Sequence, residues 1–500
     1  MARHKPTRRN FLKAVGASAL AVAVPTEALP RAAQAQPRYH DPQASSKGRP
    51  DRMNVIVILM DTLRRDYLGC YGNTSIRTPA MDAFAARATC FDRAYCGSFP
   101  TVPMRTDAFT GNCNWPRYGW KPLGDEEITV TQCLREAGYH TGLILDTSNM
   151  VPAKFPRDFH EYDLIGPPPE NTTKPNDIEM PFPAENVRQG GGGYRRDMAR
   201  MAHMRHETDW FVARTMIRAG EWLEDNYQRE PFFLWVDTFE IHEIWRAPDY
   251  YTRLYSPGPF EGHDYCFPNY GYIDIYARQE YDRLRARYAA EVTLTDKWVG
   301  VLLRQIEEMR LLDSTMVMLV SDHGMYLGEH SRMGKHTVDE NDPWPIYEEV
   351  GGIPLIVWLP GAKLPKRVSA LVQAADIAPT IIDAAGAGGP QMYGRSIVPL
   401  LSGDARRHWD FIFTSRHCGS GPGPSGARRS HITVTGPRYS LVVGREPFEA
   451  ELFDRRADPG QLHNCISKHP RIAKQTRDAL VEFMRAGGSD EEYIETYTRL

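Results

Sequence analysis

The chain has 500 residues, of which 42% are hydrophobic, and a formal net charge of −3 at pH 7. This length and apolar content suffice for one large α/β domain with a smaller appended domain, or for two ordinary domains. The acidic balance argues against a nucleic-acid binder, which needs a basic surface, so an anionic substrate would have to be held by local charge.

The first 35 residues predict an export signal. Thr7–Lys13 contain two adjacent arginines, a short apolar run follows over residues 14–24, and Ala33–Ala35 form an AxA cleavage site. This pattern resembles a twin-arginine signal peptide. A single membrane anchor is the alternative, but an apolar run of about eleven residues is too short to span the bilayer. We expect cleavage after Ala35, the twin-arginine translocation machinery as a partner, and a periplasmic or secreted bacterial protein without a permanent membrane span.

A buried strand is predicted directly after a polar linker over residues 36–50. The run Asn54–Met60 is apolar without interruption, as in a central parallel strand covered on both faces. Asp61 follows it, at the end of a strand where open α/β sheets place their ligands. A helix-capping aspartate is the alternative interpretation.

The segment from Thr101 predicts the start of a helix. Pro103 suits a first helical turn and Gly111 suits a helix end, so Thr101 would lie at an N-terminus that favours anions. Arg105, one turn further on, could donate to sulfate or phosphate oxygens. Ordinary surface helices often carry the same Pro and Arg pattern, so this segment alone does not establish a functional site.

The next stretch combines core elements with an insertion. A strand over residues 141–145 precedes a polar, Pro- and Gly-rich region, and we expect residues 152–208 to form a surface insertion near the mouth of the site. A helix over residues 209–226 then leads to a strand over residues 232–236, which ends at Asp237.

The strongest local signal follows a long helix predicted over residues 281–309. The apolar strand at 315–320 ends in Ser321, Asp322, His323 and Gly324. Parallel strands would bring Asp61, Asp322 and His323 to one sheet edge, beside Thr101. These four residues could hold one divalent cation, Mn²⁺ or Ca²⁺ with Zn²⁺ as an alternative, which would activate the Thr101 hydroxyl. The alternative interpretation of His323 is a structural histidine, buried in the core with its hydrogen bonds satisfied.

The C-terminal part predicts a smaller unit. Short alternating runs after residue 401 indicate an antiparallel sheet, closed by a helix near residues 472–485. The predicted fold class is therefore α/β, with a large doubly wound mixed sheet flanked by helices over residues 51–400 and an α+β subdomain over 401–500. Most of the eight cysteines are expected to be small buried side chains, although some could pair between Cys70 and Cys133.

Several motifs resemble the sulfatase family of the alkaline phosphatase superfamily. They are NVIVILMDTLRRDYLGCYGN from Asn54, FDRAYCGSFPTVPMRTDAFTG from Phe91, LVSDHGMYLGEH from Leu319 and MGKH from Met333, followed by matching blocks to Asn464. The resemblance implies an alkaline phosphatase-like fold and one divalent cation held by Asp61, Asp322 and His323. It also implies that Arg105 and Lys335 contact the anionic group and that His242 assists the leaving group or the substrate oxygens.

The chain departs from the family at the nucleophile. Family sulfatases carry Cys or Ser there, which becomes formylglycine, whereas this chain has Thr101. Threonine would give a ketone, so we expect no formylglycine, and Ser98 lacks the following arginine of the motif. Threonine resembles instead the phosphoester-cleaving relatives, such as nucleotide phosphodiesterases and lipoteichoic-acid-type phosphoglycerol transferases. The two-zinc relatives fit poorly, because Asp237 and His242 lack their spacing.

The sequence thus predicts an exported, metal-dependent hydrolase of phosphate, phosphonate or sulfate esters, with Thr101 as direct nucleophile. Transfer of a phospho-group to an alcohol acceptor is one alternative. Non-catalytic binding of sulfated or phosphorylated glycans is the other, and the intact set of Asp61, Asp322, His323, Arg105 and Lys335 argues against it.

Overall fold

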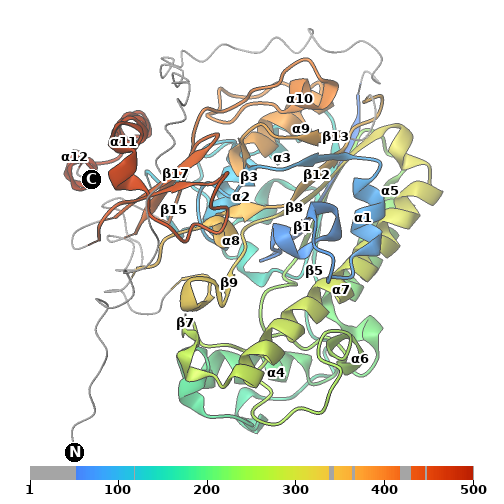
Figure 1. Cartoon of the computed structure of the whole chain (residues 1–500). Helices are drawn as coiled ribbons and strands as arrows, with labels where there is room; N and C mark the ends of the chain where they lie inside the picture. The colour runs from blue at the N-terminus through green and yellow to red at the C-terminus, as the bar shows by residue number, and fades with distance from the viewer. Residues whose placement is uncertain are drawn as a thin grey trace, which may run out of the picture. The chain divides into compact units, whose positions relative to one another are not determined.

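The structure is a computed structural model that describes residues 52–117, 119–336, 343–362, 366–416, 430–444 and 448–498 (Figure 1). All of these residues belong to one compact unit. The predicted signal peptide (1–35) and linker (36–50) lie outside the described residues and stay predictions. Within the described ranges, every helix is too short or too polar to cross a bilayer.

Eight strands form one central sheet. They are β1 (Asn54–Met60), β2 (Thr89–Phe91), β4 (His140–Leu145), β5 (Glu161–Leu164), β6 (Phe232–Thr238), β8 (Thr315–Ser321), β12 (Leu355–Trp358) and β13 (Lys366–Val368). Their order is β13-β2-β12-β8-β1-β6-β4-β5. The five strands from β8 to β5 run parallel, whereas β12 is antiparallel to both of its neighbours. The predicted mixed sheet is confirmed.

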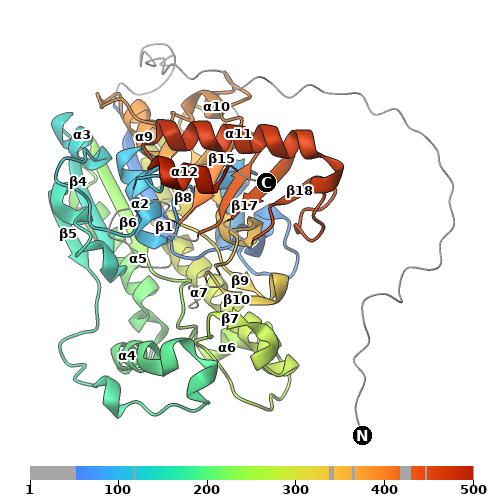
Figure 2. The ribbon, with the colours of Figure 1, turned by 90° about the vertical axis from the view of Figure 1, so that its left-hand side faces the viewer.

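Both faces of this sheet are buried, which explains the unbroken apolar run in β1. Val55, Val57 and Leu59 pack into one hydrophobic core and Ile56 and Ile58 into another. The helices on the two faces are α2 (Thr101–Thr110), α3 (Val130–Glu136) and α9 (Ile377–Ala385) on the first, and α1 (Pro79–Ala85), α5 (Phe211–Asn226) and α7 (Arg278–Glu308) on the second (Figures 1 and 2). The fold is therefore a three-layer α/β arrangement, as predicted.

The C-terminal part forms a separate antiparallel sheet. Its strands are β15 (Ile412–Ser415), β16 (Ile432–Thr435), β17 (Tyr439–Val443) and β18 (Glu451–Asp454), in that order. The helices α11 (Pro470–Ala486) and α12 (Glu491–Thr496) complete it (Figure 2). Phe413, Leu441 and Leu480 share a third core with Trp115. The smaller α+β unit is thus confirmed, whereas the boundary at residue 401 stays a prediction.

Shorter elements connect these layers. Two three-stranded sheets combine β7 (Gly271–Tyr272), β10 (Arg332–Gly334) and β9 (Tyr326–Leu327), and β11 (Gly352–Ile353), β3 (Ala94–Tyr95) and β14 (Val372–Gln373). The remaining helices are α4 (Gly192–Met201), α6 (Asp249–Thr252), α8 (Glu348–Gly351) and α10 (Val398–Ser402).

The insertion over residues 152–208 differs from its prediction in one respect. Its strand β5 pairs in parallel with β4 and forms the edge of the central sheet, so the insertion is not purely a surface loop. Tyr162 and Leu164 are exposed, and the short segment EYDL has no buried apolar run. A polar edge strand of this kind has no pattern that distinguishes it from a loop. The rest of the insertion consists of short helical turns and α4.

The described cysteines are unpaired thiols. Cys90, Cys96, Cys113, Cys133 and Cys266 are buried, while Cys70 and Cys465 are half-buried. The expectation that most act as small buried side chains is confirmed for the described residues, and Cys418 lies outside them.

One contact ties the edge of the sheet to α5 and can be tested. The indole of Trp222 is buried on Gly142 of β4 and donates to Glu161 of β5. A Cβ at Gly142 would overlap this ring. We therefore expect Gly142→Ala to lower the free energy of unfolding by about 1–3 kcal/mol, measured from the urea denaturation midpoint.

Gly192→Ala provides the control. Gly192 has helical dihedral angles, and nothing lies within 4 Å of a Cβ built there. This variant should be neutral or stabilised by about 0.4–1 kcal/mol. Equal stabilities of the two variants would contradict the importance of the Trp222 contact.

Candidate active site

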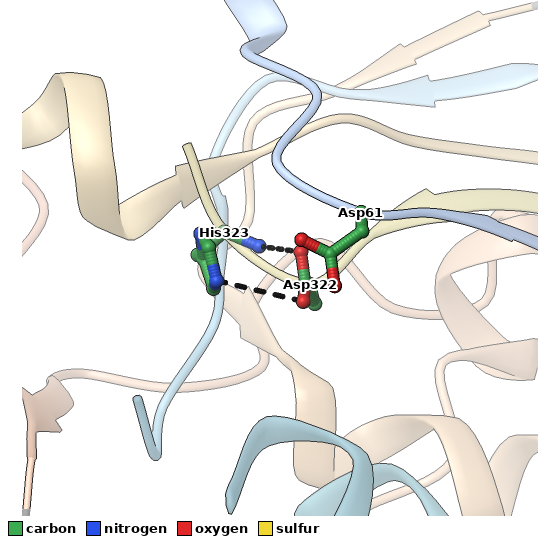
Figure 3. Close-up of side chains that lie close together, drawn as sticks. All are labelled: Asp61, Asp322 and His323. Atoms are coloured by element: carbon green, nitrogen blue, oxygen red, sulfur yellow. Dashed lines mark hydrogen bonds and ion pairs between the residues drawn. The ribbon is translucent and has the colours of Figure 1, made fainter. Parts of the chain in front are cut away.

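Three predicted ligands meet at the carboxyl ends of two neighbouring strands. Asp61 follows β1 and Asp322 and His323 follow β8, and Met60 lies opposite Ser321 in the parallel register. One ligand atom of each residue lies within 4.8 Å of the others, and all three side chains are fully buried (Figure 3). The expectation that strand order gathers these residues is confirmed.

His323 presents a lone pair to this cluster. Its Nδ1 lies 2.9 Å from the carbonyl oxygen of Gly324, which only accepts, so Nδ1 carries the proton and Nε2 does not. Nε2 lies 3.5 Å from Asp322 Oδ2 and 3.5 Å from Thr101 Oγ1. Burial, and then the nearby Lys335 ammonium, lower the pKa of His323 to about 3. The imidazole is therefore neutral, as a metal ligand must be.

Thr101 is the first residue of α2, as predicted, and the helix ends at Gly111 with φ +67°. Its side chain is buried beside His323 and lines a pocket of about 640 Å³. Ser98, three residues earlier, instead donates to Asp107 and accepts from the Asn114 and Trp115 amides. Of these two residues Thr101 lines the pocket, whereas Ser98 holds the preceding loop.

Arg105 points away from the expected anion. It is fully buried, and its guanidinium contacts three carboxylates: Nη1 lies 2.6 Å from Asp322, Nη2 lies 3.2 Å from Asp61, and Nε and Nη2 lie 3.0 and 2.8 Å from Asp237. Nη1 also donates to the Thr101 carbonyl at 3.2 Å. The sequence predicts that the N–H donors of Arg105 face a sulfate or phosphate. In the structure these donors instead contact the carboxylates at three strand ends.

Asp237 is the functional residue whose role the sequence did not indicate. It is the next-to-last residue of β6, accepts two hydrogen bonds from Arg105, and accepts one from Thr147 at 2.6 Å. The pattern of an apolar strand ending in aspartate, shared with Asp61 and Asp322, was the available signal. The group of side chains whose ligand atoms lie within 4.8 Å of one another consists of Asp61, Asp322 and His323 among the described residues. Asp237 is not in this group, so we assign it the role of orienting Arg105.

The donors present suit a divalent cation. Asp61 Oδ2 is buried and accepts no hydrogen bond from the described residues. It lies 3.2 Å from Arg105 Nη2, as an ion pair whose geometry is not that of a hydrogen bond. Three carboxylates against one guanidinium leave negative charge uncompensated at this edge. Two carboxylates, a neutral imidazole and a hydroxyl are hard or borderline ligands. These residues therefore fit the divalent cation that the sequence predicts.

Thr62 completes the turn between the two carboxylates. Its hydroxyl donates to Asp61 at 2.6 Å and its amide to Asp322 at 2.9 Å. Its φ is +63°, which is strained for a β-branched residue and is tolerated only where the surroundings impose it. The two hydrogen bonds that Thr62 donates from this turn hold the carboxylates of Asp61 and Asp322 in place.

Lys335 and His242 line the pocket together with Thr101. Lys335 is 5% exposed, and its Nζ has no hydrogen-bond partner among the described residues. Burial lowers the pKa of Lys335. A buried ammonium without a hydrogen-bond acceptor beside an open pocket is suited to receive an anion, because a buried donor left unpaired is costly.

His242 is held by two neighbours. Its ring stacks on Phe239 with centroids 4.1 Å apart, and Nδ1 donates to the Glu243 carbonyl at 2.7 Å. Burial, and then the Lys335 charge, lower the pKa of His242 well below its usual range. Its Nε2 is therefore unprotonated. Of the four predicted catalytic residues, Thr101, His242 and Lys335 line the pocket, and Arg105 lies behind it.

Comparisons with known proteins identify related chains. The family model described as Sulfatase matches residues 53–387, and the one described as N-sulphoglucosamine sulphohydrolase, C-terminal, matches residues 340–486. An N-acetylglucosamine-6-O-sulfatase of Bacteroides thetaiotaomicron is 24% identical over 89% of this chain and 88% of its own.

Two solved structures share the fold. The phosphonate monoester hydrolase of Agrobacterium radiobacter has a TM-score of 0.70 at 20% identity, over 87% of this chain and 96% of its own. A structure described as a complex with its substrate D-glucosamine-2-N,6-O-disulfate has a TM-score of 0.65 at 19% identity, over 89% of this chain and 98% of its own.

The two kinds of carboxylate at this edge should differ in their response to metal. At a hundredfold excess over its dissociation constant, a divalent cation should stabilise the wild-type protein by about 2.7 kcal/mol. We expect Asp322→Asn to lose this stabilisation, because it removes a ligand. The measurement is thermal unfolding with added Mn²⁺ or Ca²⁺ and with a chelator.

Asp237→Asn is the matched variant. It removes a buried partner of Arg105, so it should cost about 3–5 kcal/mol with or without metal, while the increase in stability on adding metal persists. If Asp237→Asn abolished the response to metal and Asp322→Asn did not, the assignment of ligands would be wrong.

Proposed function

Because the chain belongs to the sulfatase family and is a hydrolase of sulfuric or phosphoric esters, we propose that Thr101 is its direct nucleophile and that the reaction depends on one divalent cation. The observation that carries this proposal is the position of the Thr101 hydroxyl. It is the buried hydroxyl at the floor of the pocket, 3.5 Å from the unprotonated Nε2 of His323 and beside the Asp61 and Asp322 carboxylates.

Asp61, Asp322, His323 and Thr101 are the residues that would hold the cation. When bound, Mn²⁺, Ca²⁺ or Zn²⁺ would lower the pKa of the Thr101 hydroxyl and polarise the ester oxygens. The donor set supports one such ion and does not select among the three.

The chain's own residues account for the remaining requirements. Lys335 binds the non-bridging oxygens, since its ammonium is buried and unpartnered among the described residues. The Thr101 oxygen attacks the phosphorus or sulfur and the bond to the leaving alcohol breaks. The Nε2 lone pair of His242 in the same pocket can take the hydroxyl proton and return it to the leaving oxygen. Water then cleaves the ester formed on Thr101.

Threonine favours phosphorus over sulfur in this scheme. Family sulfatases release sulfate by collapse of a formylglycine hemiacetal, which a threonine hydroxyl cannot form. A phospho-threonine intermediate, by contrast, is open to attack by water. We therefore propose phosphodiesters or phosphonate monoesters as preferred substrates. The relatives also include a sulfatase acting on a sugar, so the substrate we propose is a small anionic ester or a sulfated or phosphorylated glycan.

The nucleophile is tested with aryl phosphodiester, phosphonate and sulfate esters in the presence of Mn²⁺ or Ca²⁺. Thr101→Ala should lower kcat by roughly 10³-fold or more, since it removes the attacking oxygen. Thr101→Ser should retain part of the activity. High-resolution mass spectrometry of the Thr101 peptide after incubation with substrate should detect an added phosphoryl group and distinguish it from a sulfuryl group.

Thr106→Ala is the control on the same helix. The Thr106 hydroxyl is buried and donates to the Val102 carbonyl at 3.0 Å, and it does not line the pocket. This variant should keep its activity. Full activity of Thr101→Ala would exclude Thr101 as the nucleophile.

We further propose export by the twin-arginine route to the periplasm or beyond. The supporting observation is the sequence of residues 1–35, with its arginine pair and AxA site. N-terminal sequencing of the protein isolated from the periplasm should begin at Gln36. Replacing Arg8 and Arg9 by lysine should leave the precursor in the cytoplasm. A mature protein that still begins at Met1 would contradict the prediction.

A further inference from the structure

The pocket has a second group of basic residues, at its outer wall. Besides Lys335, the basic side chains Arg188, Arg196 and Arg200 line it, and all three come from the insertion over residues 152–208. Among the described residues that line the pocket, Asp197 is the acidic one. This positive lining stands against a chain whose formal net charge is −3, so it is local to the pocket.

These basic residues differ in their depth. Lys335 is 5% exposed, whereas the side chains of Arg188, Arg200 and Arg196 are 23%, 32% and 62% exposed. Lys335 therefore lies with Thr101 at the floor, and Arg196 and Arg200 lie toward the mouth. A ligand with a single anionic group bound near Lys335 would therefore offer no anionic group to Arg196 and Arg200.

The charge of Arg188 is compensated inside the protein. It forms an ion pair with the buried Glu243, which also accepts from the Tyr270 hydroxyl. Its guanidinium lies over the rings of Tyr270 and Phe267, 4.6 and 5.5 Å from their centroids. Arg188 therefore links the insertion to the segment that carries His242 and contributes little free charge.

Arg196 and Arg200 retain free charge. Both lie one turn apart on α4 and share a single carboxylate, Asp197, at 3.2 and 3.9 Å. Two guanidinium groups against one carboxylate leave one positive charge exposed to the pocket. Arg200 is further positioned over the Phe211 ring, 5.3 Å from its centroid. A guanidinium at this site can make paired hydrogen bonds to a sulfate, phosphate or carboxylate.

Part of the pocket lining is apolar. Trp120, Leu164, Pro167, Phe239 and Phe267 line the same pocket. Trp120 and Leu164 are 41% and 44% exposed, so they present apolar surface to whatever enters. Such surface suits the face of a sugar or aryl ring placed between two charged groups.

We propose that Arg196 and Arg200 form a second anion-binding subsite, and that the natural substrate is an ester carrying a second anionic group on its leaving part. The second group is a sulfate, phosphate or carboxylate, separated from the scissile group by a ring. This proposal rests on the proposed function for the identity of the floor, and it concerns recognition of the leaving group, not the chemistry at Thr101.

Binding of aromatic sulfonates tests the subsite without catalysis, because their carbon–sulfur bond is not an ester. Calorimetry on the mature protein compares a naphthalene monosulfonate with a naphthalene disulfonate at low salt. We expect the disulfonate to bind roughly tenfold more tightly. This preference should shrink at high salt, because the mouth is exposed to solvent.

The variants locate the effect. Arg196→Gln combined with Arg200→Gln should reduce the preference to about twofold or less. Arg195→Gln makes the same change of charge on α4 at a residue that does not line the pocket, so it should keep the preference. If the double variant fails to fold, the single variant Arg196→Gln, which changes an exposed side chain, should also show a reduced preference for the disulfonate.

Three results would overturn the subsite: equal affinity for the two sulfonates, a preference that survives in the double variant, or no binding of either sulfonate. The outcome is separable from the proposed function. Thr101→Ala should keep the preference for the disulfonate even though it loses hydrolysis. A wrong nucleophile would therefore appear in the activity panel and leave the binding preference unchanged.

Discussion

The arrangement of the site depends on one buried guanidinium among three carboxylates. Arg105 contacts Asp61, Asp237 and Asp322, each at the end of a different strand of the parallel core. Three carboxylates brought this close repel one another in a medium of low dielectric, and Arg105 offsets part of that repulsion. The charge it leaves uncompensated makes the edge of the sheet suitable for a cation.

The same guanidinium couples Thr101 to the sheet. Arg105 lies one turn after Thr101 on α2 and donates to the Thr101 carbonyl, so the carboxylates that it binds also hold the first turn of α2 against the edge of the sheet. The Thr101 hydroxyl consequently lies at the pocket floor next to His323. Positioning of this kind, by rigid elements and not by loops, is what pre-organised catalysis requires. The strained turn at Thr62 serves the same end.

The insertion separates recognition from chemistry. The central sheet supplies Asp61, Asp322 and His323 and α2 supplies Thr101, whereas the outer wall of the pocket comes largely from residues 152–208. Arg188 joins the two parts through Glu243, next to His242. The residues of the outer wall can therefore change while Asp61, Asp322, His323 and Thr101 stay in place. This division is common where loops on a rigid α/β scaffold line the site.

The sequence by itself determined the layers, because a strand buried on both faces must be continuously apolar, as β1 and β8 are. It also determined that Asp61 lies close to Asp322 and His323, because the carboxyl ends of parallel strands lie at one edge of the sheet. It also identified Thr101 as the start of a helix through Pro103 and Gly111. Only the tertiary structure decided what Arg105 binds, because its partners lie 44, 132 and 217 residues away in sequence. The tertiary structure also revealed the polar edge strand β5 and the position of Arg196 and Arg200 at the pocket. Both depend on how distant segments pack together, and such packing leaves no periodic pattern in the sequence.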